Sequence, residues 1–185
     1  MTQNFTLSRS ACGLLVIDVQ EKLFPFVDRG CEVMQQMQIL VKAFQKMGLP
    51  IYSTEQYPQG LGPTVAELKA YLGNSQQYLS KTTFSCLKDP QIKTMLLSEP
   101  ISQWVLIGIE AHVCILQTAR DLLAEGKQVA IVNNAITSRS IYDFSTAIAE
   151  MRDMGVRVTS TETVLFELLK DSQVAEFKQI IELIK

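Results

Sequence analysis

Short apolar runs alternate along this chain with longer segments in which apolar residues recur every three or four positions. Runs such as 11–19 and 103–107 have the length and composition of buried strands that are covered on both faces. Segments such as 31–47 and 115–125 carry a single apolar stripe, which is typical of amphipathic helices. Strand and helix patterns alternate about six times. The pattern predicts an α/β fold: a three-layer, doubly wound, about six-stranded, mostly parallel sheet with helices on both faces.

The predicted elements cover most of the chain, and we expect residues 1–185 to form a single domain of ordinary size. Glycines at 48 and 126 are expected to end helices, and Gly108 to end a strand. Polar residues predict turns at 20–30, 55–63 and 133–139. Strands are predicted at 11–19, 49–54, 76–79, 103–107, 128–132 and 155–159, and helices at 31–47, 65–71, 90–97, 115–125, 142–154, 162–169 and 174–184.

Composition excludes several functional classes. Lys and Arg number 17 against 19 Asp and Glu, a balance that attracts neither nucleic acid nor anionic lipid. No apolar run approaches the roughly 20 residues of a membrane-spanning helix, and residues 1–10 are too polar for a signal segment, so we expect a cytoplasmic protein. Four scattered cysteines and a single histidine predict no disulfide framework, no metal and no cofactor.

Three chemically active side chains stand where strands end. Asp18 closes the first apolar run, Lys81 follows the third, and Cys114 opens the helix after 103–107. In parallel sheets, ligands bind at the carboxyl ends of the strands. A thiol at a helix N-terminus and near an ammonium group is expected to ionise easily, while an aspartate can accept its proton and pass it to a leaving amine. Taken singly, each residue also has a structural interpretation: a buried cysteine, a surface lysine and a loop cap.

Five stretches match one known family. In order they read Leu-Leu-Val-Ile-Asp-Val-Gln (14–20), Lys-Thr-Thr-Phe-Ser (81–85), Val-Leu-Ile-Gly-Ile-Glu-Ala-His-Val-Cys (105–114), Thr-Ala (118–119) and Asn-Ala-Ile-Thr-Ser-Arg (134–139). The chain resembles the isochorismatase-like cysteine hydrolases, which include nicotinamidases and N-carbamoylsarcosine amidase, from about residue 12 to 170. Its loop 54–62, Thr-Glu-Gln-Tyr-Pro-Gln-Gly-Leu-Gly, is similar to that of isochorismatase-domain proteins whose substrates are poorly defined.

The resemblance implies a role for each position. Cys114 corresponds to the nucleophile that forms an acyl intermediate, Asp18 to the general base and acid, and Lys81 to the residue that tunes both. It also implies a non-proline cis peptide between Ile109 and Glu110, with the N–H groups of Glu110 and Cys114 aimed at the oxyanion. We therefore expect hydrolysis of a C–N bond in a small amide or ureido substrate by a homo-oligomer.

The sequence departs from the family pattern at two places. Where nicotinamidases hold a metal ion, this chain has Glu55 and Tyr57, and no histidine follows in that loop, which disfavours a metal-dependent nicotinamidase. Ala111 stands where relatives often have threonine, which puts the local turn geometry in question. True isochorismatases protonate a vinyl ether and lack the cysteine, so Cys114 favours acyl chemistry.

A further set of residues is predicted to line the substrate pocket. Aromatic residues in these loops could equally be loop packing or a cap over a small flat substrate, and the histidine is expected in the pocket wall or at an interface. The set is Gln20, Phe24, Gln56, Tyr57, Phe84, His112 and Val113.

Other interpretations of the chain remain open. The fold could serve as a binding or scaffold protein without turnover, or a low-pKa Cys114 could act as a thiol redox sensor. The spacing from Cys114 to Arg120 fits a tyrosine-phosphatase loop, but the five residues between include no glycine to let the backbone wrap a phosphate. Met151, Met154 and Phe166 suggest a self-associating surface.

Overall fold

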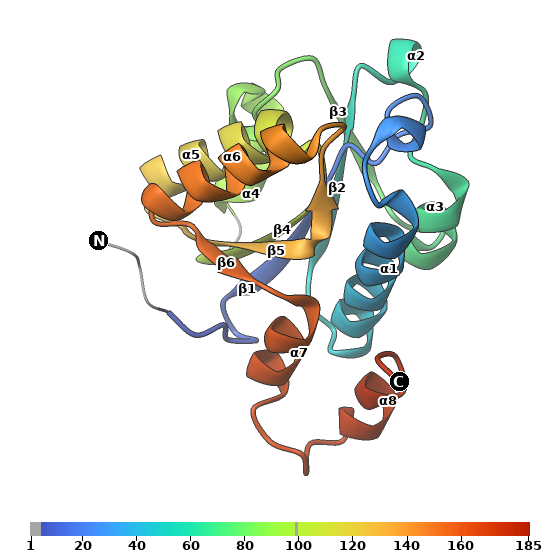
Figure 1. Cartoon of the computed structure of the whole chain (residues 1–185). Coiled ribbons are helices and arrows are strands. Elements are labelled where there is room, and N and C mark those ends of the chain that lie inside the picture. Colours follow the sequence, from blue (N-terminus) through green and yellow to red (C-terminus); the bar gives the residue numbers. More distant parts are fainter. Residues whose placement is uncertain (1–4, 99) are drawn as a thin grey trace.

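A computed structural model describes residues 5–98 and 100–185, so residues 1–4 of the polar N-terminal stretch lie outside it. Over the described residues the chain forms a six-stranded sheet in the order β3-β2-β1-β4-β5-β6, with every neighbouring pair parallel (Figure 1). This confirms the predicted doubly wound fold. The strands are β1 (Cys12–Ile17), β2 (Ile51–Gln56), β3 (Tyr78–Lys81), β4 (Gln103–Ile109), β5 (Gln128–Thr137) and β6 (Arg157–Thr159).

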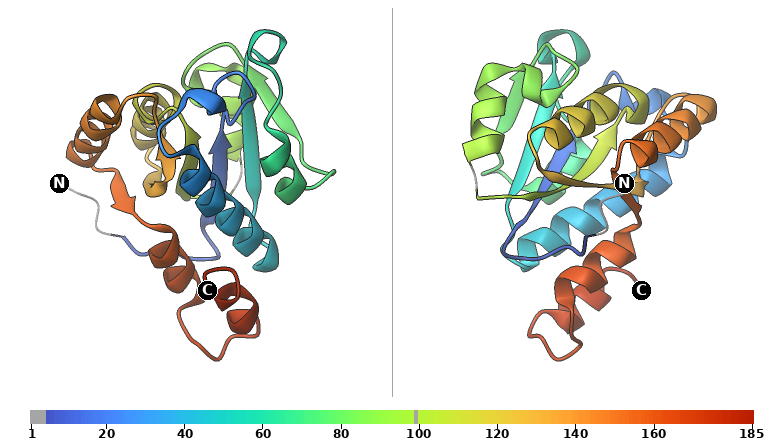
Figure 2. Two further views of the ribbon diagram at one scale, coloured as in Figure 1. Left: turned by 45° about the vertical axis from the view of Figure 1, so that its right-hand side comes forward. Right: turned by 90° about the vertical axis from the view of Figure 1, so that its left-hand side faces the viewer.

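Apolar cores lie on both faces of the sheet, as the continuous apolar runs predict. In β1, Leu14 and Val16 point into one core and Leu15 and Ile17 into the other. Figure 2 shows the resulting layers. The helices over the first face are α1 (Gly30–Lys46), α3 (Ala66–Leu72), α7 (Thr161–Leu169) and α8 (Phe177–Ile181); those over the second are α4 (Pro90–Ser98), α5 (Leu116–Ala124) and α6 (Ile141–Asp153). The prediction of one domain stays a prediction, and a single sheet shared by both cores supports it.

Helix ends agree with the glycine signals. α1 and α5 each end two residues before a glycine with positive φ, Gly48 at 66° and Gly126 at 76°. Glycine adopts this left-handed conformation without a Cβ penalty, which is why it ends helices.

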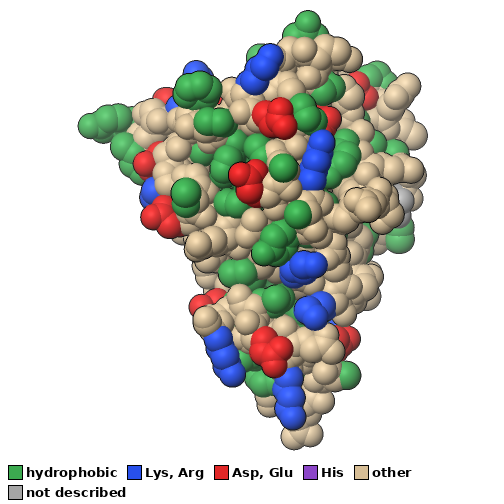
Figure 3. Space-filling view, turned by 90° about the vertical axis from the view of Figure 1, so that its right-hand side faces the viewer, with side chains coloured by type: hydrophobic (Ala, Val, Ile, Leu, Met, Phe, Trp, Pro, Cys, Tyr) green, Lys and Arg blue, Asp and Glu red, His purple; other side chains and the backbone are tan. Residues whose placement is uncertain are grey.

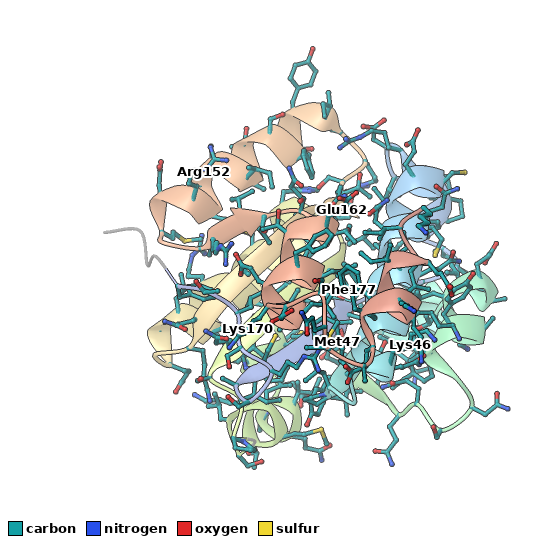
Figure 4. All side chains as sticks on the ribbon, turned by 90° about the horizontal axis from the view of Figure 1, so that it is seen from below. Lys46, Met47, Arg152, Glu162, Lys170 and Phe177 are labelled. Carbon is teal, nitrogen blue, oxygen red and sulfur yellow. The ribbon has the colours of Figure 1, made fainter. Side chains whose placement is uncertain are left out.

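The C-terminal helix α8 lies beside α1. Its residue Phe177 packs against the first core, near Met47 (Figure 4).

The expected stop at Gly108 is wrong. β4 continues through this residue to Ile109, and Gly108 has a φ of 121°. A Cβ atom here would lie 2.1 Å from the backbone oxygen of Ile17 in β1. The glycine therefore allows two neighbouring strands to approach closely and carries β4 on to the turn that holds Cys114.

The predicted polar turn at 133–139 is also wrong over most of its length, because β5 runs on to Thr137. The pairing of β5 with β4 is irregular: Leu106 and Gly108 lie opposite Ile131 and Ile136. The polar side chain of Asn134 in this irregular segment is used by two helices, since it donates to Gln36 of α1 and accepts from the backbone N–H of Thr161 in α7. The polar residues of this segment therefore bind neighbouring helices, and they do not mark a turn of the chain.

Smaller differences concern the loops and the C-terminus. The predicted loop 55–63 contains α2 (Pro58–Leu61), short 3-10 turns form at Phe24–Phe26 and Cys86–Lys88, and the predicted helix 174–184 is reduced to Phe177–Ile181. Met151 was expected on a self-associating surface, but it is buried in the core beneath α6. Met151 lies on the apolar side of α6 that faces the core. Phe166, which was expected on the same surface, is exposed.

Candidate functional site

The three residues predicted to be catalytic lie together at the carboxyl edge of the sheet. Asp18 follows β1, Lys81 is the last residue of β3, and Cys114 lies in a π-helical turn (Ala111–Ile115) after β4. The Nζ atom of Lys81 is 2.6 Å from Oδ2 of Asp18 and 3.8 Å from Sγ of Cys114. Exposed fractions are 0%, 2% and 6% for Asp18, Lys81 and Cys114. An acid, an amine and a thiol thus meet in a site that is nearly closed to water.

Lys81 is held by oxygen acceptors on several sides. Besides Asp18, its Nζ donates to Oε1 of Gln56 at 2.8 Å and to the carbonyl oxygens of Thr83 and Phe84 at 3.2 Å. Burial by itself lowers the pKa of Lys81, but the charge of Asp18, the nearby Cys86 and Cys114 and the hydrogen bond to Asp18 together outweigh this, so the pKa lies above its usual value. The side chain is therefore a buried ammonium paired with a carboxylate.

The thiol of Cys114 differs from the sequence expectation. Burial raises the pKa of this thiol, the charge of Asp18 raises it further, and the opposing effect of Lys81 is smaller. The expectation that this thiol ionises easily is therefore wrong for the resting site. The reason is partly local, because Cys114 sits inside a π-helical turn ahead of α5 (Leu116–Ala124) instead of at an open helix N-terminus. In the resting site the sulfur keeps its proton, and the side chain of Asp18 lies within hydrogen-bond reach of it.

Two contacts of the site have no counterpart in the sequence interpretation. Oγ1 of Thr54 donates to Oδ1 of Asp18 at 2.7 Å, with both side chains buried. The Sγ atom of Cys86 lies 4.0 Å from the same Thr54 oxygen, and burial raises the pKa of Cys86 to about 11. Cys86 is therefore a buried, neutral thiol. Thr54 could have been found from the sequence, because it ends the predicted second strand beside the strand that ends at Asp18.

The turn between β4 and the cysteine has the backbone that the resemblance implies. The peptide bond between Ile109 and Glu110 is cis. Oε1 of Glu110 accepts hydrogen bonds from the backbone N–H and from Nε of Arg139, at 3.1 and 2.9 Å. This contact ties the turn that precedes Cys114 to the end of β5.

The predicted pocket residues have different fates. Gln20 is fully buried, and its side chain bonds only backbone groups: it donates to the carbonyls of Gln56 and Gly62 and accepts from the N–H of Gln56. It therefore holds two loops together. Gln56 faces Lys81, and Phe24 packs against the core beneath α1. Sequence position placed these residues near the edge of the sheet, the structure gives each of them an internal contact, and their place in a substrate pocket stays a prediction.

The other predicted pocket residues lie at the same carboxyl edge of the sheet, and their place in a substrate pocket stays a prediction. Tyr57 and Phe84 are 53% and 54% exposed, and the Tyr57 ring lies against Gly60 of its own loop. Val113 is half-buried against the second core. His112 is also half-buried; its Nδ1 lies 2.9 Å from Oγ of Ser138, and its Nε2 lies 4.0 Å from Oδ2 of Asp143. The histidine therefore faces the residue that follows β5 and the first turn of α6, and its role in a pocket wall stays a prediction.

The larger surface grooves lie elsewhere. One of about 460 Å³ runs between α1, α3 and residues 182–185, and none of the three catalytic candidates lines it. Figure 3 shows the right-hand face of Figure 1, where acidic and basic side chains are interspersed among apolar ones. That face carries no gathered basic patch of the kind that binds nucleic acid.

Among the residues that the structure describes, no group of three His, Cys, Asp or Glu side chains could hold a metal ion. Glu55, which stands at a metal position of nicotinamidases, accepts instead from the backbone N–H and the hydroxyl of Thr64. Within the same described part of the chain, no helix is long and apolar enough to cross a bilayer. The cytoplasmic location stays a prediction.

The model of the isochorismatase domain matches residues 12–163, which includes all three clustered side chains. This chain belongs to the isochorismatase family. It is 38% identical over 178 residues to isochorismatase domain-containing protein 2 of Danio rerio, with 96% of this chain and 89% of that protein covered. The family assignment confirms the resemblance drawn from the five sequence stretches.

Solved structures of other proteins share the fold. MAR1 ribonuclease from Caenorhabditis elegans has a TM-score of 0.91 and 34% identity, with 97% of this chain and 92% of that chain covered. The YcaC gene product of Escherichia coli, an octameric hydrolase of unknown specificity, has a TM-score of 0.90 and 20% identity, with 99% and 92% covered. The chain thus has the fold of the isochorismatase-family hydrolases.

Proposed function

We propose that this isochorismatase-family protein is a cysteine hydrolase that cleaves the C–N bond of a small amide or ureido substrate. The observation that carries the proposal is the buried contact set of Lys81, whose Nζ lies 2.6 Å from Asp18 and 3.8 Å from Cys114. A nucleophile, a base and a charge that orients both are the parts such chemistry needs.

The reaction divides into two halves. The sulfur of Cys114 attacks the carbonyl carbon, and its proton passes to the carboxylate of Asp18. The tetrahedral intermediate then expels the nitrogen, which takes that proton and leaves as ammonia or an amine, so that an S-acyl enzyme remains. A water molecule gives a proton to Asp18 and attacks the thioester, and the carboxylic acid leaves while the thiolate recovers a proton from Asp18.

Lys81 and the backbone stabilise the charges that form. The ammonium of Lys81 faces both the carboxylate and the sulfur, so it favours the thiolate that exists during attack and release. We assign the oxyanion to the backbone N–H groups of Glu110 and Cys114, as the family resemblance implies. Because the resting thiol is neutral, proton transfer to Asp18 accompanies attack, and the reaction does not start from a stored thiolate.

A substrate panel tests the proposal. The protein is incubated with primary amides and N-carbamoyl amino acids, ammonia release is measured, and intact mass identifies an adduct on Cys114. We expect at least one substrate to release ammonia and Cys114→Ser to lower kcat by about a thousandfold or more. Cys31→Ser is the matched control, because Cys31 is exposed elsewhere on the surface and should leave turnover unchanged. Ammonia release that survives Cys114→Ser contradicts the mechanism.

One protein of the same fold, from Caenorhabditis elegans, is named a ribonuclease, so RNA must be included in the substrate panel. The chain has one histidine and a formal charge of −2, which is a poor basis for binding a polyanion. We therefore expect no shortening of a labelled RNA by the purified protein. Cleavage that depends on Cys114 would overturn the C–N assignment.

The two non-hydrolytic alternatives have less support. A redox sensor needs a thiol that ionises easily, whereas burial raises the pKa of Cys114. A scaffold that has lost turnover has no use for a buried Lys81 in contact with both Asp18 and Cys114. If Cys114 reacts with an alkylating reagent but never forms a substrate adduct, the redox-sensor interpretation is favoured. If Cys114 does not react at all, the scaffold interpretation is favoured.

We also propose that the protein is a homo-oligomer. Five large apolar side chains are exposed in the segments that follow β1, β2, β3 and β5 at the carboxyl edge, two of them in the first turn of α6, and such surface is of a kind that partners cover. The octameric state of the E. coli fold relative is in line with this. Light scattering tests it: we expect a mass of two or more chains, lowered by Tyr142→Glu, since Tyr142 is 82% exposed. The five are Phe26, Tyr57, Phe84, Ile141 and Tyr142.

A further inference from the structure

The carboxyl end of β2 contacts both members of the buried ion pair. Thr54 and Gln56 are two residues apart in a strand, so their side chains point to the same face. The pairing register sets Thr54 beside Ile17, the residue before Asp18, and sets Gln56 beside Lys81. Glu55, between them, points the other way and binds Thr64. One short strand end therefore presents one polar group to the carboxylate and another to the ammonium.

Thr54 makes the two oxygens of Asp18 different. Its hydroxyl donates to Oδ1 at 2.7 Å, while the ammonium of Lys81 donates to Oδ2 at 2.6 Å. Thr54 and Asp18 are both fully buried, so no water replaces either donor. Rotation of the carboxylate breaks both bonds, and the loss of a buried bond to a charged group is costly. The plane of the carboxylate is therefore held in one orientation toward the sulfur.

Gln56 holds the ammonium from a different side. Its Oε1 accepts from Lys81 at 2.8 Å, and its Nε2 donates to the carbonyl oxygen of Thr82 at 2.7 Å. The amide cannot flip without losing both bonds. Asp18, Gln56 and the two carbonyls at 3.2 Å satisfy the three N–H groups of Lys81, which leaves the sulfur at 3.8 Å as the most distant partner. Because Gln56 is neutral, Asp18 is the only carboxylate that pairs with Lys81 among the residues that the structure describes.

We propose that Thr54 and Gln56 are positioning residues of the hydrolase: Thr54 orients the carboxylate of Asp18 toward the thiol, and Gln56 holds the ammonium of Lys81 between the carboxylate and the sulfur. The inference rests on the proposed function, but its test needs no substrate. The readout is the rate at which iodoacetamide alkylates Cys114, followed by mass spectrometry from pH 5 to pH 10.

For Thr54, the informative variants are Thr54→Val, which keeps the shape and removes the hydroxyl, and Thr54→Ser, which restores it. We expect Thr54→Val to slow alkylation at pH 7 about tenfold, and to move the acid-side midpoint of the profile upward by about one pH unit, because the ionised carboxylate loses a donor. Thr54→Ser should return the alkylation rate at pH 7 to within about threefold of the parent rate, and the acid-side midpoint to within about 0.3 pH unit of the parent value. Thr54→Ala replaces Thr54→Val if the latter does not fold.

For Gln56, the informative variant is Gln56→Glu, which keeps an acceptor of the same length and adds a negative charge. We expect the rate of Cys114 alkylation at pH 10 to fall about threefold or more relative to the parent, because a second carboxylate offsets the charge of the ammonium that favours the thiolate. Glu55→Gln is the matched control from the same strand, and it should leave the acid-side midpoint and the rate at pH 10 unchanged.

The outcomes separate this inference from the function on which it rests. A purely structural role for Thr54 and Gln56 lowers the melting temperature and leaves both the acid-side midpoint and the alkylation rate at pH 10 where they are, and that result overturns the inference. Asp18→Asn serves as the reference variant. If Asp18→Asn alters the profile while Thr54→Val and Gln56→Glu do not, positioning by β2 is wrong. If Asp18→Asn itself has no effect, the proposed acid–base chemistry is wrong.

Discussion

At the scale of single residues, the site depends on an ion pair that is completely out of water. The side chains of Asp18 and Lys81 have no exposed surface, and they are joined at 2.6 Å. Taking two charges out of water is costly, and only their contact and the surrounding hydrogen bonds offset it. The neighbours Thr54 and Gln56 supply those bonds. We therefore expect this pair to respond very differently to the loss of one partner and to the loss of both.

Replacing Lys81 alone should be strongly destabilising. Lys81→Met keeps the volume but leaves Asp18 as an uncompensated buried charge, and we expect the free energy of unfolding to fall by about 3–5 kcal/mol at pH 7. The double variant Asp18→Asn with Lys81→Met should recover much of this loss, since neither charge remains. Urea unfolding gives the free energy of unfolding of the parent, of Lys81→Met and of the double variant. A double variant less stable than Lys81→Met alone would contradict this account.

At the scale of elements, the strands β1 and β4 form the base of the site, and Gly108 sets how closely they approach. A Cβ atom at Gly108 would come within 2.1 Å of the Ile17 backbone oxygen, and the residue also has a φ of 121°. Ile17 precedes Asp18, and Gly108 precedes the Ile109–Glu110 peptide. The spacing of the two strands at this point therefore affects both the base and the turn that holds the nucleophile.

We expect Gly108→Ala to lower the free energy of unfolding by more than about 2 kcal/mol, because backbone must move to admit the methyl group. Gly73→Ala is the matched control. Gly73 also has a positive φ, 88°, but no atom lies within 4 Å of the position that an alanine methyl group would occupy, so only the backbone penalty of about 1–3 kcal/mol applies, and the loss should be smaller than at Gly108. Denaturant unfolding of both variants separates the two effects, and equal losses would show that the strand contact contributes nothing.

At the scale of the whole molecule, buried thiols make stability sensitive to alkaline pH. Burial raises the pKa of Cys12 from 9.0 to about 12 and that of Cys86 from 9.0 to about 11. In the unfolded chain these thiols ionise above about pH 9, while in the folded protein they keep their protons. The unfolded state therefore gains relative to the folded state as the pH rises. The stability that the buried, protonated thiols of Cys12 and Cys86 contribute is fully present below pH 9. It is lost as the pH rises from 9 to about 11 to 12.

The expected result is a fall in the free energy of unfolding of up to about 1.4 kcal/mol per pH unit for each such thiol. Urea unfolding at pH 8, 9 and 10 measures it. Because other groups also titrate in this range, the decisive comparison is between variants: Cys12→Ala should reduce the slope, and Cys31→Ala, at an exposed position, should not. Equal slopes in the parent and Cys12→Ala would contradict the assignment.

The order of strands and helices, and the edge at which Asp18, Lys81 and Cys114 gather, could be predicted from the sequence alone. Apolar periodicity reports which residues are buried locally, and the carboxyl ends of parallel strands lie at one edge of the sheet, so the position of a residue just after a strand is enough to place it there. The same logic places Tyr57 and Phe84 at this edge, since each lies in the segment after a strand.

Only the tertiary structure decided how these groups meet. Which side chain faces which across neighbouring strands depends on register, and it is register that sets Gln56 against Lys81 and makes Gln20 a brace between loops. Periodicity carries no information about register, nor about the irregular pairing that extends β5 through a polar segment. The ionisation of Cys114 likewise follows from desolvation in the assembled site, which a local helix pattern cannot report, so the thiol expected to be charged is held neutral.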